Sequence, residues 1–293
     1  MIYISLDMAQ HKRRNKRKRQ TPADERRRHL LWSIGIPLLL TFLFTVWHYR
    51  KGINYYLKTF FAVVNVDGKE YSKYDSRNIS LMSLHSEHTF GIDVSEYQGN
   101  IIWDSVSLIH EQFPVDFVFI RASMGARGKD KKFASNWKGV QRISRLRGAY
   151  HYFRPNENSI KQAENFIKVV KLKPGDLPPV LDIEERPRSQ SMDSLKVGLK
   201  RWLRRVEQHY KVKPIVYSGD SYFTDFLEKE FSDYTLWIAN YNFWIEKPKA
   251  HWNFWQFSEK GRVKGIKGFV DLNMFNDDIE SLERLCMPFG REF

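Results

Sequence analysis

The sequence predicts an α/β protein: an irregular, TIM-like β/α barrel preceded by a single N-terminal transmembrane helix. Two observations predict this. From Thr89 onward, short apolar runs alternate with helical stretches, which indicates a parallel sheet covered by helices. About eight such runs over some 200 residues suggest a compact barrel. Before them, residues 30–49 contain no Asp, Glu, Lys or Arg.

The uncharged run from Leu30 to Tyr49 has the length of a membrane-spanning helix, because twenty helical residues rise about 30 Å. Trp32 and Trp47 lie near its two ends, where aromatic rings favour the membrane interface. The run is long for a signal peptide, and no small-residue cleavage site follows it, so a retained anchor is favoured over a cleaved leader.

Basic residues set the expected orientation of this segment. Ten Lys and Arg precede it, at 12–14, 16–19 and 26–28. The positive-inside rule places the N-terminus in the cytoplasm and everything after Arg50 outside, so the expected location is the cytoplasmic (inner) membrane with a periplasmic or extracellular barrel. Residues 1–50 hold 11 Lys or Arg against 3 Asp or Glu, and the rest of the chain holds 37 against 31. Orientation accounts for the basic tail, so no nucleic-acid partner is expected.

Four regions follow from these patterns: a basic cytoplasmic tail over 1–29, the membrane helix over 30–49, a membrane-proximal spacer over 50–87 and the barrel over 88–288. Within the spacer, Asp67-Gly68 suggests a hairpin turn after an apolar run. Cys286 is the only cysteine, so the chain has no internal disulfide, and a buried thiol is favoured over a nucleophile.

The barrel region contains the following expected elements. The strands are 90–94, 117–122, 148–153, 179–183, 215–217, 236–239, 253–256 and 269–272. The helices are 103–112, 133–145, 160–170, 192–209 and 221–230.

Acidic residues occur where several of these strands end. Asp182 and Glu184 follow a short apolar run, and their spacing puts both on one face of an extended strand, about 6.6 Å apart. Like charges at that distance push their pKa values apart, so one remains an acid while the other is ionised. Asp93 ends the first strand and Asp271 lies in the last. Because barrel chemistry occurs at the carboxyl ends of strands, all four are expected at one rim.

Aromatic and amide side chains are expected at the same rim. Sugar rings stack on aromatic faces, so this rim suits a polysaccharide, although each aromatic taken singly is more often part of a core. The candidates are Tyr97, Gln98, Tyr150, Tyr152, Tyr217, Trp237, Tyr241, Trp255 and Gln256.

Five ordered motifs resemble glycoside hydrolase family 25, the Chalaropsis-type lysozymes. They span about residues 89–275 and begin at positions 91 (GIDVSEYQG), 147 (RGAYHYFRP), 181 (LDIE), 254 (FWQFS) and 265 (GIKGFVD). The resemblance implies an irregular barrel and a muramidase that cleaves the β-1,4 bond between N-acetylmuramic acid and N-acetylglucosamine in peptidoglycan. It implies Glu184 as general acid/base, with Asp182, Asp93 and Asp271 completing the acidic site, and no metal or other cofactor.

The sequence departs from the family pattern at one place. Family members often carry Thr-Glu-Gly after the second strand, whereas this chain has Ser123-Met124-Gly125 after Arg121. A missing carboxylate and the basic Arg121, itself a candidate substrate contact, could alter subsite preference or favour an anionic peptide stem.

Three functions stay open at this point. An anchored muramidase is favoured, because a protein that only binds glycan has no need for the carboxylate pair. A non-catalytic tether between envelope and membrane and a barrel glycosidase acting on chitin-like glycans are the alternatives. From the position of Asp182 beside Glu184 we expect the substrate's 2-acetamido group, oriented by Asp182, to act as the nucleophile, a route that retains configuration.

Overall fold

The computed structural model describes residues 22–54 and 72–288, and the chain divides into two compact units, Met1–Tyr55 and Tyr56–Phe293. The main element of the first unit is α1 (Pro22–His48), a continuous helix that contains Pro37. A search of the described residues finds no helix both long and apolar enough to cross a membrane, so the predicted transmembrane segment over 30–49 is not confirmed. Most of the basic tail and the predicted hairpin at 61–68 lie outside the described residues.

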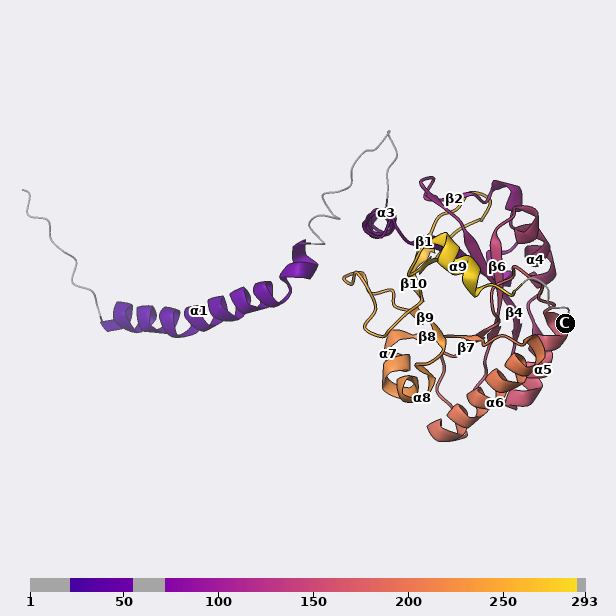
Figure 1. Ribbon diagram of the computed structural model, residues 1–293. Helices are drawn as coiled ribbons and strands as arrows, with labels where there is room; N and C mark the ends of the chain where they lie inside the picture. The colour runs from indigo at the N-terminus through magenta and orange to yellow at the C-terminus, as the bar shows by residue number, and fades with distance from the viewer. Residues whose placement is uncertain (1–21, 55–71, 289–293) are drawn as a thin grey trace, which may run out of the picture. The chain divides into compact units, whose positions relative to one another are not determined.

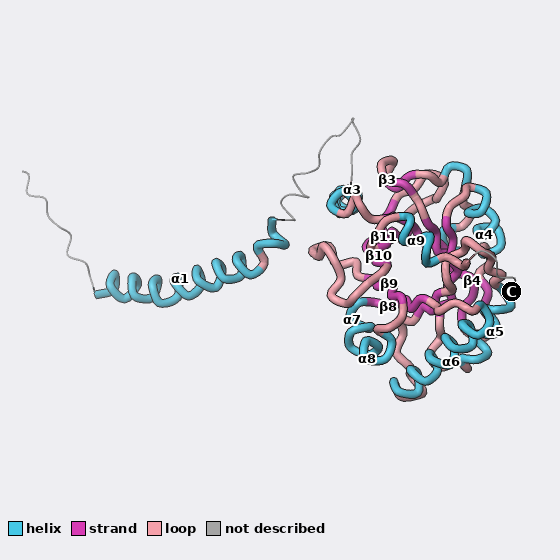
Figure 2. The backbone as a smooth tube through the Cα atoms, viewed as in Figure 1, coloured by secondary structure: helices cyan, strands magenta, loops and turns pink. Residues whose placement is uncertain are grey.

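Eight strands of the second unit close into a barrel (Figures 1 and 2). The sheet order is β1-β11-β10-β9-β8-β7-β6-β4, and β1 pairs with β4 to complete the ring. Their bounds are β1 Thr89–Val94, β4 Phe117–Met124, β6 Leu146–Tyr152, β7 Val180–Asp182, β8 Ile215–Gly219, β9 Thr235–Ala239, β10 Phe254–Gly261 and β11 Val270–Phe275. All eight predicted strands are therefore present.

The barrel is mixed rather than all parallel. β11 runs antiparallel to both β1 and β10, while the other pairings in the ring are parallel. Because of this reversal, the first residues of β11 lie at the rim where the parallel strands end. Asp271, near the start of β11, consequently pairs with Asp93, near the end of β1.

Helices cover the outside of the barrel between successive strands. They are α4 Phe133–Arg142, α5 Ser159–Val169, α6 Met192–Tyr210 and the run formed by α7 Asp220–Tyr222, a π-helical turn Phe223–Leu227 and α8 Glu228–Phe231. These four agree with the predicted helices within a few residues. α9 (Ile279–Leu285) follows β11, and its Leu282 packs into the barrel interior at the end opposite to the rim of Asp93 and Asp271.

The predicted helix over 103–112 is wrong. This segment forms a short 3₁₀ turn, Trp103–Ser105, and then a small hairpin of β2 (Leu108–Ile109) and β3 (Phe113–Pro114). His110 and Glu111 both have positive φ angles, 49° and 60°, which a right-handed helix cannot contain. A further short strand, β5 (Gly128–Lys129), pairs with the end of β4 outside the ring.

Residues 73–84, within the predicted membrane-proximal spacer, form a helix, α3 (Lys73–Leu84). Leu81 and Met82 join the barrel's outer core, and Arg77 donates hydrogen bonds to the carbonyl oxygens of Phe257 (2.6 Å) and Asn242 (3.2 Å). These contacts attach α3, which precedes residue 88, to the barrel.

Two hydrophobic clusters hold this unit together. The larger one lies between the sheet and its helices and includes Trp202, Trp255 and Phe166. The smaller one fills the barrel interior with side chains such as Phe117 and Phe119. This inner cluster occupies one end of the barrel and leaves the other end for polar residues.

Candidate active site

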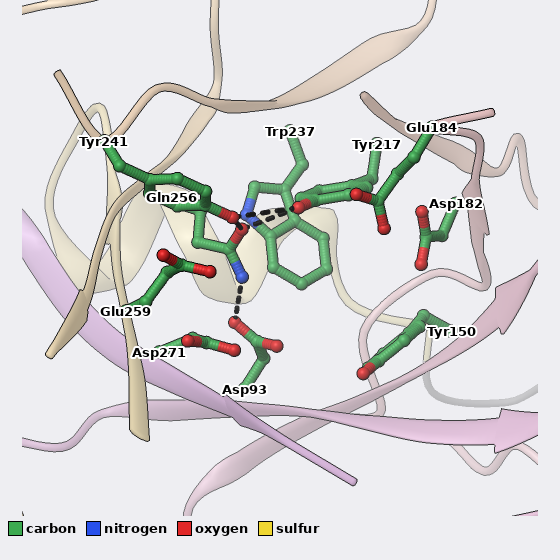
Figure 3. Close-up of a pocket in the computed structure, with 10 residues that line it drawn as sticks. All are labelled: Asp93, Tyr150, Asp182, Glu184, Tyr217, Trp237, Tyr241, Gln256, Glu259 and Asp271. Atoms are coloured by element: carbon green, nitrogen blue, oxygen red, sulfur yellow. Dashed lines mark hydrogen bonds between the residues drawn. The ribbon is translucent and has the colours of Figure 1, made fainter. Parts of the chain in front are cut away.

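A cavity of about 180 Å³ opens at the rim where the parallel strands end (Figure 3). It is lined by Asp93, Tyr150, Asp182, Glu184, Tyr217, Trp237, Tyr241, Gln256, Glu259 and Asp271. All four predicted carboxylates and five of the ten predicted substrate contacts are therefore brought together. These nine residues come from seven strands or the segments that follow them.

Asp182 and Glu184 lie side by side on one wall of the cavity, as their spacing predicts. β7 ends at Asp182, which is buried, whereas Glu184 follows the strand and is exposed at the mouth. Asp182 Oδ1 is buried and has no hydrogen-bond partner among the described residues. Glu184 is thus the carboxyl that a polymer entering from solvent reaches first, with Asp182 behind it.

Burial raises the pKa of both carboxyl groups of this pair. Burial and the adjacent charge of Glu184 hold the pKa of Asp182 well above its usual range. Burial also raises the pKa of Glu184, and its interaction with the Asp182 side chain lowers that pKa in part. The protonation of one carboxyl group of the pair therefore depends on the protonation of the other.

Asp93 is held by two amide side chains at the floor of the cavity. Its Oδ2 accepts hydrogen bonds from Asn273 Nδ2 at 2.8 Å and from Gln256 Nε2 at 2.5 Å. Burial raises the pKa of Asp93 to about 6, and these two hydrogen bonds limit the rise. Because both neighbours donate to the same oxygen, the orientation of the carboxyl group is fixed.

Asp271 lies directly across the strand pair from Asp93, with Glu259 nearby. Burial raises the pKa of Asp271 to about 8, and the charges of Asp93 and Glu259 add to the rise. Like charges placed opposite each other on neighbouring strands destabilise the fold. The carboxylates of Asp93, Glu259 and Asp271 therefore repel one another at the floor of the cavity, and protonation of Asp271 reduces this repulsion.

Tyrosine hydroxyls and Trp237 complete the walls. Gln256 Oε1 accepts hydrogen bonds from the hydroxyls of Tyr217 (2.6 Å) and Tyr241. The indole N–H of Trp237 donates to Asn273 Oδ1 at 2.8 Å. Two amide side chains thus connect the aromatic walls to Asp93, and the cavity is rigid and polar, as recognition of sugar hydroxyls requires.

Three predicted substrate contacts lie outside this cavity. Gln98 caps a short turn by accepting a hydrogen bond from the backbone N–H of Ser95 (2.8 Å). Arg121 is buried and forms an ion pair with Asp130 (3.0 Å). Its guanidinium lies 4.6 Å from the ring centroid of Tyr97, which is 80% exposed. Arg121 therefore orders the loops around the rim and does not face the cavity.

Tyr152 and Trp255 also do not line the cavity. The hydroxyl of Tyr152 donates to Glu185 Oε1 at 2.7 Å, next to the mouth. Trp255 is fully buried in the outer core, so a glycan cannot reach it. Consecutive strand residues point to opposite faces, and since Gln256 faces the cavity, Trp255 must face the helices.

Glu259 and Asn273 were missed by the sequence prediction. β10 departs from regular register between Gln256 and Ser258 and again between Ser258 and Gly261. These irregularities break the alternation, so counting along the strand does not place Glu259 in the cavity. Asn273 lies two residues after Asp271, and this spacing in an extended strand was the available signal.

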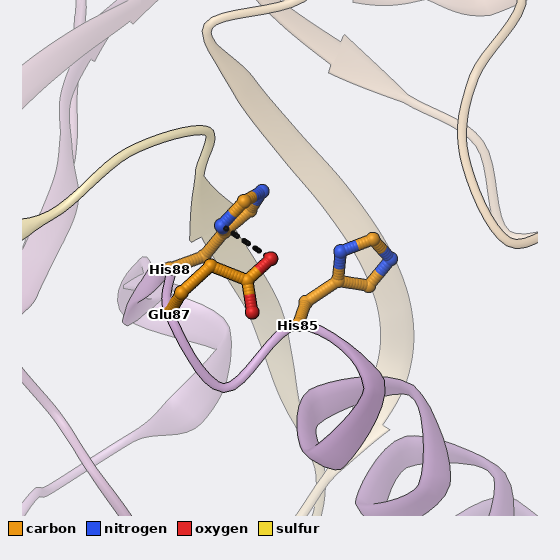
Figure 4. A group of neighbouring side chains, drawn as sticks. All are labelled: His85, Glu87 and His88. Carbon is orange, nitrogen blue, oxygen red and sulfur yellow. Dashed lines mark ion pairs between the residues drawn. The ribbon is translucent and has the colours of Figure 1, made fainter.

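One group of side chains in the described part of the chain has the composition of a metal site. Ligand atoms of His85, Glu87 and His88 lie within 4.8 Å of one another at the connection from α3 to β1 (Figure 4). His88 and Glu87 are 3.4 Å apart as an ion pair. None of the three lines the cavity, so they have no part in its chemistry.

A closed β/α barrel with a carboxylate pair at the mouth of a polar cavity is typical of a glycosidase. The family model for Glycosyl hydrolases family 25 matches residues 92–266. The protein YegX of Escherichia coli K12 is 35% identical over 239 residues, 80% of this chain and 86% of its own. Lysozyme M1 of Streptomyces globisporus is 32% identical and covers 67% of this chain and 70% of its own.

Solved structures agree with the sequence comparisons. A family 25 glycosyl hydrolase from Bacillus anthracis superposes with a TM-score of 0.62 at 29% identity, over 69% of this chain and 95% of its own. A lysozyme from Streptomyces coelicolor gives a TM-score of 0.61 at 29% identity, over 68% and 96%. The chain belongs to glycosyl hydrolase family 25 and is a glycosidase of the lysozyme type, as the five motifs predict.

Proposed function

We propose that this enzyme hydrolyses the β-1,4 bond between N-acetylmuramic acid and N-acetylglucosamine in peptidoglycan, with Glu184 as general acid/base. The observation that carries the proposal is the adjacent pair Asp182 and Glu184 on one wall of the cavity, with the exposed Glu184 at its mouth. Relatives named as lysozymes supply the substrate class.

Binding of the sugar moves the proton to the acid. In the proposed free state the proton resides on Asp182, because burial and the charge of Glu184 hold the pKa of Asp182 well above its usual range. When the acetamido N–H of the substrate donates a hydrogen bond to Asp182, it stabilises the ionised form of Asp182. The proton then resides on Glu184, which gives it to the glycosidic oxygen as the bond breaks.

The nucleophile in this proposal is the acetamido oxygen of the substrate itself. The side chains of Asp182 and Glu184 project from the same wall of the cavity (Figure 3). Neither carboxyl group therefore lies on the far side of a sugar ring bound against that wall. Asp182 Oδ1 is buried and unpaired, and an acetamido N–H supplies the donor that it lacks. Water activated by Glu184 then opens the cyclic intermediate, and the product keeps the β configuration. A first product in the α configuration by NMR would rule this route out.

Asp93 and Asp271 support the pair electrostatically. They line the same cavity, and the charge of Asp93 contributes to the raised pKa of Asp182. Fixed by Asn273 and Gln256, Asp93 also offers an oriented acceptor for a sugar hydroxyl. No step of this route uses a metal ion.

Digestion of purified sacculi tests the proposal against a non-catalytic tether and against a chitin-type glycosidase. The second compact unit, residues 56–293, is the fragment of choice, because a start near residue 85 would remove α3. We expect reducing-end muramic acid from the wild type and at least about a thousandfold less from Glu184→Gln. Release of reducing-end N-acetylglucosamine alone would favour the chitin-type alternative, and no product from either variant would favour the tether.

The proposed substrate lies outside the cytoplasmic membrane, so the proposal includes export of the barrel, with the N-terminus held in the cytoplasm. Support comes from the basic residues before the uncharged run at 30–49, and from large apolar side chains of α1 that are exposed, such as Trp32, Leu38 and Trp47. Alkaline phosphatase fused after residue 293 should be active in cells. An inactive fusion, or full-length protein in the soluble fraction, would contradict this location.

A further inference from the structure

A second cavity, of about 440 Å³, lies at the carboxyl ends of β4 and β6. Its walls are the turn after β4, residues 125–128, and the segment from Arg154 to the first turn of α5. The charged side chains that line it are Arg127, Arg154, Glu157 and Lys161. The proposed function assigns no role to this cavity.

The wall formed by residues 125–128 is held in place by side chains from neighbouring elements. The buried amide of Asn165 donates to the carbonyl oxygens of Gly125 (3.0 Å) and Gly128 (2.8 Å). Glu157 Oε2 accepts the backbone N–H of Ala126 at 2.6 Å. Since Gly125 has a φ of 54° and packs against Glu157, the turn is fixed in this shape before any ligand binds.

The cavity carries an excess of positive charge. Among the residues that the structure describes, Glu157 is the only carboxylate that lines it, and it is paired with Arg154 at 3.3 Å. The other neighbour of the Arg154 guanidinium is the uncharged sulfur of Met124, at 3.5 Å. Arg127 and Lys161 are exposed, and neither side chain forms an ion pair with a described residue. Two cations are thus available to an anionic ligand.

Strand register shows that the cavity is within reach of a glycan in the active site. Met124 on β4 pairs with Tyr152 on β6, which pairs with Asp182 on β7. Neighbouring strands lie about 4.8 Å apart, so the end of β4 is about 10 Å from Asp182 along the rim. A peptide of about three extended residues on a sugar bound beside Asp182 spans that distance, because each residue adds at most about 3.5 Å.

We propose that this cavity binds a carboxylate of the peptide stem on the muramic acid residue whose glycosidic bond is cleaved. The inference rests on the proposed function, because it assumes a muramoyl glycan in the active site. The stem leaves the sugar through its lactyl group and bears free carboxylates, which form charge-assisted hydrogen bonds with Arg and Lys. Arg127 and Lys161 therefore make the enzyme prefer glycan that carries stems over bare glycan.

The test compares two polymers with the full chain: sacculi solubilised with stems intact, and the same glycan after an amidase has removed the stems. We expect the wild type to have a kcat/KM about tenfold higher for the stem-bearing polymer, mainly through KM. The double variant Arg127→Gln, Lys161→Gln should lose this preference and keep its rate on bare glycan. Raising the salt concentration should reduce the wild-type preference in the same way.

A matched control removes the same charges elsewhere. Lys168 and Arg201 are exposed on α5 and α6 and do not line either cavity, so Lys168→Gln, Arg201→Gln should keep the wild-type preference. Preference retained by Arg127→Gln, Lys161→Gln, or equal cleavage of both polymers by the wild type, would overturn the inference alone. Cleavage of neither polymer would overturn the proposed function and this inference with it.

A competition experiment identifies the anion. Free stem peptide should inhibit cleavage of the stem-bearing polymer by the wild type and not by Arg127→Gln, Lys161→Gln. Inorganic phosphate at the same concentration and ionic strength should have a smaller effect. If phosphate inhibits as well as the peptide, the cavity is a general phosphate site and the assignment to a peptide carboxylate is wrong.

Discussion

The two ends of the barrel interior are built from the same strands and have opposite chemistry. Val180, Ile215 and Phe254 belong to the inner hydrophobic cluster. Two residues further along the same three strands come Asp182, Tyr217 and Gln256, which line the polar cavity, and the ring of Tyr217 also packs on the inner cluster. Residues i and i+2 of a strand point to the same face. Both therefore point into the barrel, but the first lies in the apolar core and the second lies at the polar cavity.

This difference separates stability from chemistry within one barrel. The apolar end gains free energy of folding by burial and aromatic packing. The polar end brings Asp93, Asp182, Glu184 and Asp271 close together, and burial raises the pKa of each, so ionising them there is costly. Substitutions at the apolar end should therefore reduce stability, and removal of a carboxylate at the polar end should increase it.

The largest expected effect on stability is at Phe119, in the apolar end. Its ring stacks on Trp237 with centroids 4.5 Å apart and also contacts Phe254. Gly148 makes room for it, since a Cβ there would lie 2.4 Å from the ring. Phe119→Ala should lower the free energy of unfolding by about 3–5 kcal/mol, measured by urea denaturation, and Phe119→Leu by about 1.5 kcal/mol or less. A loss below about 1 kcal/mol for the alanine variant would contradict the claim that the apolar end of the barrel provides its stability.

A smaller effect is expected at Arg77 on α3, which supports the polar end from outside the barrel. Arg77 is buried and donates to the carbonyl oxygens next to Gln256 and Tyr241. Arg77→Met should cost about 2–3 kcal/mol, because two carbonyl groups lose a charged donor. It should also lower kcat/KM several-fold at temperatures where the variant is folded. Arg262→Met is the control, since Arg262 is exposed and its ion pair, within the described part of the chain, is with Asp75 of α3. Lost stability with unchanged kinetics would show that α3 does not position the site.

The smallest expected effect is the pH dependence contributed by Asp271. Its pKa is about 8 in the folded protein and 3.8 as an ordinary aspartate, so between these values the folded state holds a proton that the unfolded state has lost. The contribution of this group to stability therefore falls as pH rises from about 4 to about 8.

Asp271→Asn should remove this dependence and stabilise the protein by at least about 1 kcal/mol at pH 8. Urea unfolding at pH 5 and pH 8 measures the effect, and Asp277→Asn, at an exposed position after β11, is the matched control. An unchanged difference in stability between the two pH values would contradict the assignment of the raised pKa to Asp271.

Local patterns predicted most of the ring and its acidic residues. Each barrel strand is a short apolar run, and Asp93, Asp182 and Glu184 follow such runs at the positions where parallel strands end. Local patterns failed where tertiary contacts override them. α3 buries Asp75, Arg77 and Asn78, so its sequence reads as polar and shows no helical stripe.

The sequence by itself determined most of the residues that could do the chemistry. Apolar runs locate the strands along the chain, and the acidic residues that end these runs can be read without knowing the fold. Only the tertiary structure decided how they meet. The reversal of β11 brings Asp271 opposite Asp93, and the irregular register of β10 brings Glu259 into the cavity. Burial, which depends on the whole barrel, then raises the pKa values of both Asp182 and Glu184 and leaves Glu184 exposed at the mouth.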